Sequence, residues 1–287
     1  MTVFARLLRI TAAVIALMAV PALPGARAQG ASAWKIESHA AARLISGAPA
    51  KPTDPAERRA GLEIRLDPGW ETYWRYPGDS GTPPTFDFAG SENVKAVTVR
   101  WPAPERFADG AGGHSIGYRG DVVLPLHVTA EDAAKPSLLH VKFGYAICGT
   151  LCVPAEAELD LLLSGKGGSG GPALAAAEAR VPRRVPLGSG GALAVRSVHR
   201  DKNGERVVVE VAAAEGTPVD LFVEGPAPDW ALPLPESSES AASHSQGLRR
   251  FVFKLDGLPP GADAEGATFT FTAVSPDDAI EVSTHLD

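Results

Sequence analysis

The sequence predicts an all-β fold made of two β-sandwich domains. Apolar and polar residues alternate in several short segments, among them 62–66, 97–101 and 268–272, and this period of two is typical of strands with one buried face. Turn signals separate such segments, in a chain that holds 30 Gly and 25 Pro. Helical periodicity is nearly absent after the N-terminus, which argues against a parallel sheet with alternating helices.

The individual elements follow from local pattern. Lys202-Asn203-Gly204 stands between apolar segments 193–198 and 207–211, so we expect a β-hairpin there. A second strand-like run covers 139–147. The one clear helical pattern covers 173–180, where Pro172 suits the first turn of a helix.

A change of composition divides the chain. Residues 164–171 are almost entirely Gly and Ser, and residues 182–191 are basic and rich in Gly and Pro; both compositions are typical of linkers. We therefore expect a first domain over 30–164, a flexible linker over 165–189 and a second β-sandwich domain over 190–287. Roughly 260 residues are enough for two domains with proper cores.

The first 28 residues have the pattern of a secretory signal peptide. Arg6 and Arg9 precede an uncharged run over 10–20, and Ala26-Arg27-Ala28 is a small-x-small cleavage site. Cleavage after Ala28 would remove three arginines and no acid, which takes the formal charge from −7 to about −10. So acidic a mature chain argues against nucleic acid as a partner. We expect a periplasmic protein, exported through a cleaved signal peptide.

The two cysteines carry the only chemistry that the sequence suggests. On an extended strand Cys148 and Cys152 would stand about 13 Å apart, whereas a disulfide needs Cα atoms within roughly 4.4–6.8 Å. The chain must therefore turn between them if they bond, and Gly149-Thr150 permits a turn. We expect the pair at a strand end or in a tight hairpin.

Three roles remain open for this pair from the residues alone. A loop this short gives only about 2 kcal/mol of stabilisation in the chain-entropy model, against roughly 4.7 for a 100-residue loop, and this favours reversible thiol–disulfide exchange over a structural staple. A noncatalytic binding module with a structural disulfide is one alternative. A copper-handling protein is the other, because thiolates select Cu(I) or zinc. The seven histidines are scattered without metal-ligand spacing, so we expect no metal and no cofactor.

Several longer motifs resemble the periplasmic N-terminal domain of the DsbD family of disulfide reductases, and most closely its ScsB-type branch. They occur in order over residues 34–163. The matching segments are GWETYWRYPGDSG at 69–81, WPAPERF at 101–107, IGYRGD at 116–121, and YAIC with CVPAE on either side of the turn at 145–156.

The resemblance implies a fold, a reaction and partners. The first domain would be an immunoglobulin-like sandwich carrying a redox-active cysteine pair, with the activity of a protein-disulfide reductase. The pair would take electrons from a membrane-embedded DsbD/CcdA-like electron transporter and pass them to periplasmic thioredoxin-fold proteins. Cys148 and Cys152 match the family's two cysteines, of which the second usually attacks the client disulfide.

The resemblance also implies residues that shield the pair. Phe107 looks like the aromatic residue of the family's capping loop, and Trp74 and Tyr118 would line the same pocket. Two departures stand out: the segment between the cysteines is shorter than in the best-known members, and the sequence contains neither the membrane domain nor the C-terminal thioredoxin domain. Either separate proteins supply those domains or this protein has left the electron relay.

Overall fold

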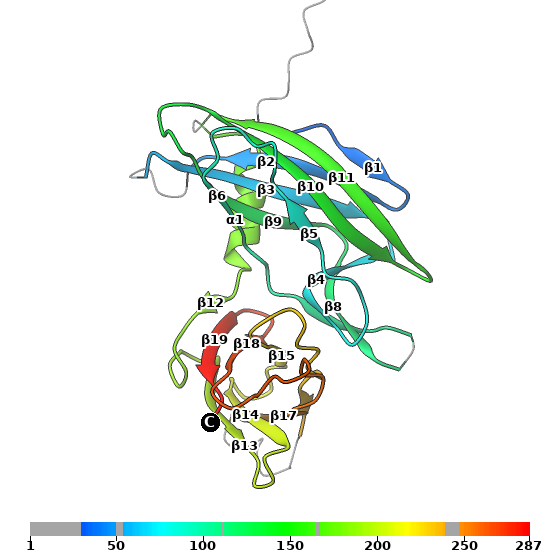
Figure 1. Cartoon of the computed structure of the whole chain (residues 1–287), viewed down its shortest axis with the longest axis vertical. Helices are drawn as coiled ribbons and strands as arrows, with labels where there is room; N and C mark the ends of the chain where they lie inside the picture. The colour runs from blue at the N-terminus through cyan, green and yellow to red at the C-terminus, as the bar shows by residue number, and fades with distance from the viewer. Residues whose placement is uncertain (1–29, 50–53, 111, 165–166, 239–246) are drawn as a thin grey trace, which may run out of the picture.

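The computed structural model describes residues 30–49, 54–110, 112–164, 167–238 and 247–287, and within them the chain forms two β-sandwiches (Figure 1). The predicted all-β class is confirmed. The predicted signal peptide, residues 1–28, lies outside the described residues. No helix among the described segments is long and apolar enough to cross a bilayer.

The first sandwich packs two sheets face to face. One sheet has the order β1-β2-β3-β9-β6, and the other has the order β11-β10-β4-β8-β7, with β5 paired to β10. Alternate side chains of β10 are buried between the layers, as the predicted period of two requires. The strands are β1 Lys35–Glu37, β2 Ala40–Gly47, β3 Glu57–Leu66, β4 Glu71–Gly78, β5 Thr85–Asp87, β6 Ala96–Val99, β7 Glu105–Ala108, β8 His114–Arg119, β9 Val122–Thr129, β10 Ser137–Cys148 and β11 Cys152–Leu163.

The second sandwich also consists of two sheets, ordered β12-β19-β18-β15 and β13-β14-β17-β16. The predicted hairpin is confirmed, since β13 and β14 pair antiparallel on either side of the turn at Gly204. The strands are β12 Arg183–Arg184, β13 Ala194–Arg200, β14 Arg206–Ala212, β15 Asp220–Glu224, β16 Glu236–Ser237, β17 Leu248–Lys254, β18 Thr268–Val274 and β19 Ala279–His285.

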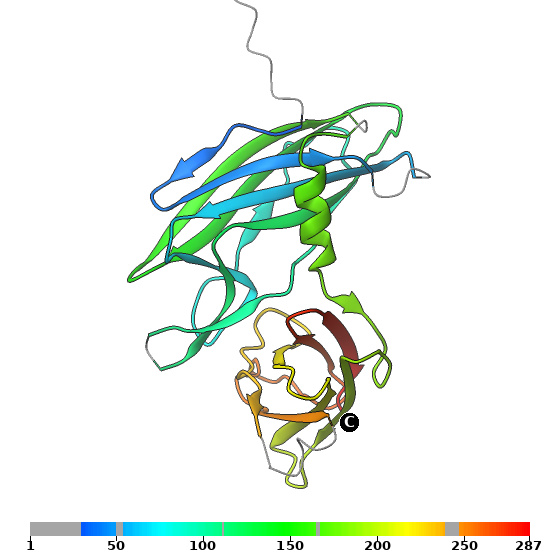
Figure 2. The ribbon, with the colours of Figure 1, turned by 180° about the vertical axis from the view of Figure 1, so that it is seen from behind.

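The segment between the sandwiches is packed in the part that the structure describes, in contrast to the flexible linker expected from its composition. Helix α1, Gly171–Ala179, lies on the face of β2, β3 and β9 (Figure 2). Its Leu174 is fully buried at Gly47 and Gly61, where an added Cβ would clash with the leucine side chain. The glycines before α1 likewise approach β2: a Cβ on Gly170 would lie 2.8 Å from Ile45. They therefore permit close packing here, while the domain boundaries themselves stay a prediction.

The two sandwiches touch through β4 and β7. Phe222 and Leu234 of the second sandwich join the apolar core of the first, and Phe222 lies 5.9 Å from Trp74 between ring centroids. In Figures 1 and 2, β4 and β8 stand between the body of the first sandwich and the second one. Strand β4, which pairs with the cysteine end of β10, is thus also in contact with the second domain.

Candidate functional site

Cys148 and Cys152 form a disulfide at the tip of a hairpin. Cys148 is the last residue of β10 and Cys152 the first of β11; they are opposite each other in the register, with Cα atoms 4.1 Å apart. Gly149 closes the turn through its amide, which donates to the carbonyl of Leu151. A side chain at Gly149 would press on the Trp70 ring, 3.1 Å from the position of its Cβ. The expected turn at a strand end is confirmed.

The two cysteines differ in their exposure. Cys148 is 3% exposed, whereas Cys152 lies on the surface. Its neighbour Leu151 is 74% exposed, so an apolar side chain stands beside the accessible cysteine. A protein that approaches the hairpin tip meets Cys152 first.

Tyr73, on β4, touches both sulfurs. Its hydroxyl lies 2.9 Å from Sγ of Cys148 and 3.4 Å from Sγ of Cys152. Disulfide sulfurs carry no hydrogen, so the hydroxyl is the donor. Burial raises the pKa of Tyr73 above its ordinary value, with smaller contributions from nearby groups. The phenol therefore stays protonated, and available as a donor, at neutral pH.

The Tyr73 ring is held by a glycine. Gly81 approaches so closely that a Cβ there would lie 2.5 Å from the ring, and its φ of +126° is in a region that L side chains rarely adopt. Gly81 belongs to the motif at 69–81, and this contact explains why that position needs glycine.

Glu71 and Arg119 extend the site along β4 and β8. Glu71 is opposite both Cys148 and Arg119 in the register, and Arg119 donates to its carboxylate at 3.3 Å. Burial raises the pKa of Glu71, although the hydrogen bond and charge of Arg119 oppose that shift. A carboxylate with a raised pKa stands one strand from the buried cysteine.

Phe107 lies on the same face as Tyr73. It is opposite Ser115 on β8, two residues before Gly117, which is itself opposite Tyr73; paired residues and residues two apart share a face. Phe107 is 3% exposed, and the Arg119 guanidinium lies 4.8 Å from its ring centroid. Although it is buried, Phe107 belongs to neither of the two apolar core clusters found among the described residues. That it shields the cysteines stays a prediction.

Trp74 and Tyr118 are not at the disulfide, and here the sequence-based expectation needs correction. Tyr118 is opposite Thr72 in the register, one residue out of step with Tyr73, so it points to the other face. Both side chains are buried in the main core of the first sandwich, and the Tyr118 hydroxyl donates to the carbonyl of Pro102. Within the described part of the chain, no group of three or more His, Cys, Asp or Glu is placed to hold a metal ion.

Sequence reasoning missed Tyr73, Glu71 and Arg119. Tyr73 and Arg119 are direct neighbours of the expected pocket residues Trp74 and Tyr118, and Glu71 lies in the matching motif at 69–81. A strand register would have found them, because it decides which of two neighbours faces the cysteines.

Comparisons with known proteins agree with this geometry. Residues 41–164 match the family model of the thiol:disulfide interchange protein DsbD, N-terminal domain. The crystal structure of the N-terminal periplasmic domain of ScsB from Proteus mirabilis matches with a TM-score of 0.69 and 20% identity, over 90% of this chain and 99% of that one. A marsupial T cell receptor matches at a TM-score of 0.23 with 10% identity, over 87% of this chain and 98% of its own, too low a score to bear on the fold. No curated protein matches.

Proposed function

We propose that this chain passes electrons between proteins through the Cys148–Cys152 pair, because residues 41–164 match the family model of the DsbD N-terminal domain. The observation that carries the proposal is the asymmetry of the pair: an exposed Cys152 and a buried Cys148 share one hydrogen-bond donor, Tyr73. A disulfide that only stabilises the fold needs neither an accessible sulfur nor a hydrogen-bond donor beside its sulfurs.

The exchange reaction proceeds in two balanced steps. In the reduced protein, the Cys152 thiolate attacks one sulfur of a client disulfide, forms a mixed disulfide and releases the client's other sulfur as thiolate. The Cys148 thiolate then attacks Sγ of Cys152 and releases the second client sulfur. The client gains two electrons, and the Cys148–Cys152 disulfide forms. A dithiol of an electron donor reverses these steps to restore the reduced pair.

Tyr73 suits both steps. Its protonated hydroxyl donates to a sulfur that bears negative charge, and a hydrogen bond to the charged form lowers a thiol's pKa. A lower pKa supplies more thiolate for attack and a better leaving group. The Tyr73 hydroxyl oxygen is 2.9 Å from Sγ of Cys148, so this donor lies beside the sulfur to which we assign the resolving role.

The proposed partners rest on the family match and on the expected export of the chain. We propose a membrane-embedded DsbD/CcdA-like transporter as the electron donor and periplasmic thioredoxin-fold proteins as clients, with the chain exported through its signal sequence. The matched ScsB domain is described as periplasmic. Leu151, exposed beside Cys152, offers an apolar contact to such a client.

Two serine variants test the proposal. Cys148→Ser leaves the attacking cysteine without its resolving partner, so it should accumulate a mixed disulfide with an oxidised thioredoxin-fold protein, detected on a non-reducing gel and by mass spectrometry. Cys152→Ser should trap far less, because its remaining thiol is buried. Equal trapping by both variants would refute the assigned roles, and no trapping by either would refute exchange with this class of client.

A further inference from the structure

Strand β4 connects the cysteine hairpin to the second domain over residues 71–76. Its first part lies against the hairpin, where Glu71 is opposite Cys148 in the register. Tyr73 has its hydroxyl within hydrogen-bond distance of both sulfurs. The next three residues, 74–76, all contact the second domain. The side chain that touches the sulfurs is therefore the direct neighbour of a segment attached to the other domain.

The pairing of β4 within its sheet is interrupted directly after Tyr73. Pairing with β10 covers Glu71 and Thr72. Pairing with β8 covers the same residues and Tyr73, and it resumes at Gly78. Residues 74–77 lie in this interruption. Because ladder hydrogen bonds fix a strand within its sheet, the position of these residues depends on other contacts.

The second domain supplies such contacts through two polar side chains of β4. Arg75 donates to Glu224 at 2.8 Å and 2.6 Å and to Glu281 at 2.6 Å. The three charged side chains are at most 24% exposed, so solvent ions screen their attraction little. The Tyr76 hydroxyl donates to the carbonyl of Leu232 at 2.6 Å. Polar contacts with the second domain thus hold β4 where its sheet pairing is interrupted.

Aromatic packing at Trp74 adds to this attachment. The Trp74 ring is fully buried and lies 5.9 Å from Phe222 of the second domain between ring centroids. The Arg75 guanidinium lies 4.3 Å from the centroid of the same ring, a distance at which a cation and a ring attract each other. Arg75 therefore binds the second domain and also packs on its own strand.

One face of β15 contacts both β4 and β7. Asp220, Phe222 and Glu224 are alternate residues of β15, and alternate residues share a face. Phe222 and Glu224 contact β4, whereas Asp220 makes an ion pair with Arg106 of β7 at 2.8 Å. Two acidic residues of one strand thus hold two different strands of the first sandwich, and β4 is the one that carries Tyr73.

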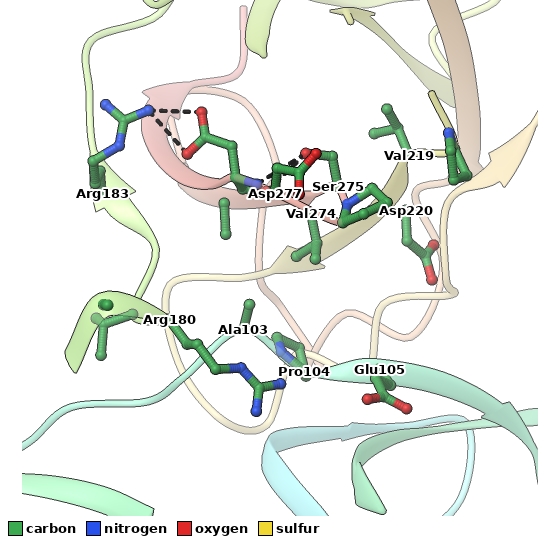
Figure 3. A pocket seen from close by; sticks show the side chains of 16 residues that line it. Ala103, Pro104, Glu105, Arg180, Arg183, Val219, Asp220, Val274, Ser275 and Asp277 are labelled. Atoms are coloured by element: carbon green, nitrogen blue, oxygen red, sulfur yellow. Dashed lines mark hydrogen bonds and ion pairs between the residues drawn. The ribbon is translucent and has the colours of Figure 1, made fainter. Parts of the chain in front are cut away.

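The interface is less tightly packed toward the start of β7. A cavity of about 580 Å³ lies between residues 103–105, the end of α1 and the loops of the second domain before β15 and after β18. Figure 3 shows Pro104 and Glu105 on one side of this cavity, with Val219 and Asp220 across it. Close packing between the domains is therefore found at β4 rather than at the start of β7.

We propose that Arg75 is a positioning residue of the thiol–disulfide site: by binding two carboxylates of the second domain it fixes β4, and so keeps the Tyr73 hydroxyl at the two sulfurs. The second domain, which has no cysteine, thereby takes part in activating the pair. This inference rests on the proposed function in that it uses the effect of Tyr73 on the reduced cysteines.

The charge of Glu224 gives the test a definite sign. A carboxylate disfavours a nearby thiolate and raises the pKa of the thiol, so removal of the charge by itself lowers the thiol pKa. Loss of positioning has the opposite effect, because a displaced Tyr73 hydroxyl stabilises the thiolate less and the thiol pKa rises. A higher thiol pKa in Glu224→Gln therefore reports positioning and not the field of the lost charge.

The measurement is the pH dependence of iodoacetamide alkylation in the reduced full chain, with the two cysteines resolved by peptide mass spectrometry. Glu224→Gln should raise the lower apparent thiol pKa by about 0.5 unit, roughly a threefold loss of thiolate below that pKa. The shift is smaller than that of Tyr73→Phe, because Glu281 and Tyr76 still hold β4. Tyr76→Phe removes a hydrogen bond without removing a charge and should shift the thiol pKa in the same direction.

Two further variants separate positioning from a general loosening of the interface. Asp220→Asn is the matched control: it removes an equal charge from the same face of β15 but acts on β7, and it should not raise the thiol pKa. Glu224→Gln in a Tyr73→Phe background should add no further rise, since Arg75 acts through the hydroxyl that has been removed. If Glu224→Gln does not fold, Tyr76→Phe alone and in the Tyr73→Phe background carries the test.

An unchanged or lowered thiol pKa in both Glu224→Gln and Tyr76→Phe would overturn the positioning role. An equal rise in Asp220→Asn, or an equal rise with and without the Tyr73 hydroxyl, would overturn it as well. Alkylation needs no client protein. Failure of this inference therefore leaves the mixed-disulfide trap of Cys148→Ser intact, whereas failure of the trap leaves the expected pKa shifts as stated.

Discussion

Tyr73 connects the two sulfurs to the body of the first sandwich. Its hydroxyl is within hydrogen-bond distance of both, and burial keeps it protonated by raising its pKa. Tyr73→Phe removes only this donor. We expect the lower apparent pKa of the reduced cysteine pair to rise by roughly one to two units, the worth of a hydrogen bond to a charged group, as followed by the ultraviolet absorbance of the thiolate.

A tyrosine on the core side of the sheet provides the control. The Tyr145 hydroxyl is buried and has no hydrogen-bond partner among the described residues, so Tyr145→Phe should leave the thiol pKa unchanged. If Tyr73→Phe and Tyr145→Phe gave the same pKa as wild type, Tyr73 would have no part in activating the cysteines.

Residue-level prediction from the sequence succeeded where the signal was local and failed where it depended on register. The turn between Cys148 and Cys152 follows from five consecutive residues. Choosing between Tyr73 and Trp74 requires the pairing register of β4 with β10, because the register decides which of the two side chains is on the same face as Cys148. Cys148 is 75 residues further along the chain than Tyr73. A one-residue step turns a side chain to the other face, and the sequence-based choice of Trp74 was one step out.

Helix α1 is the element whose role differs most from expectation. Its position and its proline at the first turn were predicted, but Gly and Ser around it indicated a flexible linker. In the structure Leu174 enters a space that Gly47 and Gly61 leave on β2 and β3. Composition alone does not distinguish glycine that permits flexibility from glycine that permits close approach, since both use the absence of a Cβ.

Leu174→Ala measures how firmly this element is fixed. The side chain is fully buried, so its loss should cost about 2–5 kcal/mol of unfolding free energy, read from the shift of the urea midpoint. Leu162, 60% exposed on β11, is the control, and Leu162→Ala should change stability little. A Leu174→Ala variant as stable as Leu162→Ala would mean that α1 is not docked on the first sandwich.

At the scale of the molecule, the alternating pattern of the strands predicted two sandwiches, but nothing in the pattern predicted how they contact each other. The contact depends on charges far apart in the chain. Burial opposes the charged form of Glu281, yet its ion pairs with Arg75 and Arg184 outweigh burial and lower its pKa. Glu281 is therefore ionised at neutral pH, and its carboxylate joins β4 of the first sandwich to β12 and β19 of the second.

The central claim is that the Cys148–Cys152 couple is a carrier of electrons, and its equilibrium reduction potential tests this most directly. The full chain is equilibrated in a series of glutathione or dithiothreitol buffers of different potential. The fraction of protein with an oxidised Cys148–Cys152 pair is then measured by thiol labelling. A carrier for thioredoxin-fold clients should have a potential within their range, about −270 to −120 mV. A potential below about −300 mV would identify a structural disulfide and contradict the account.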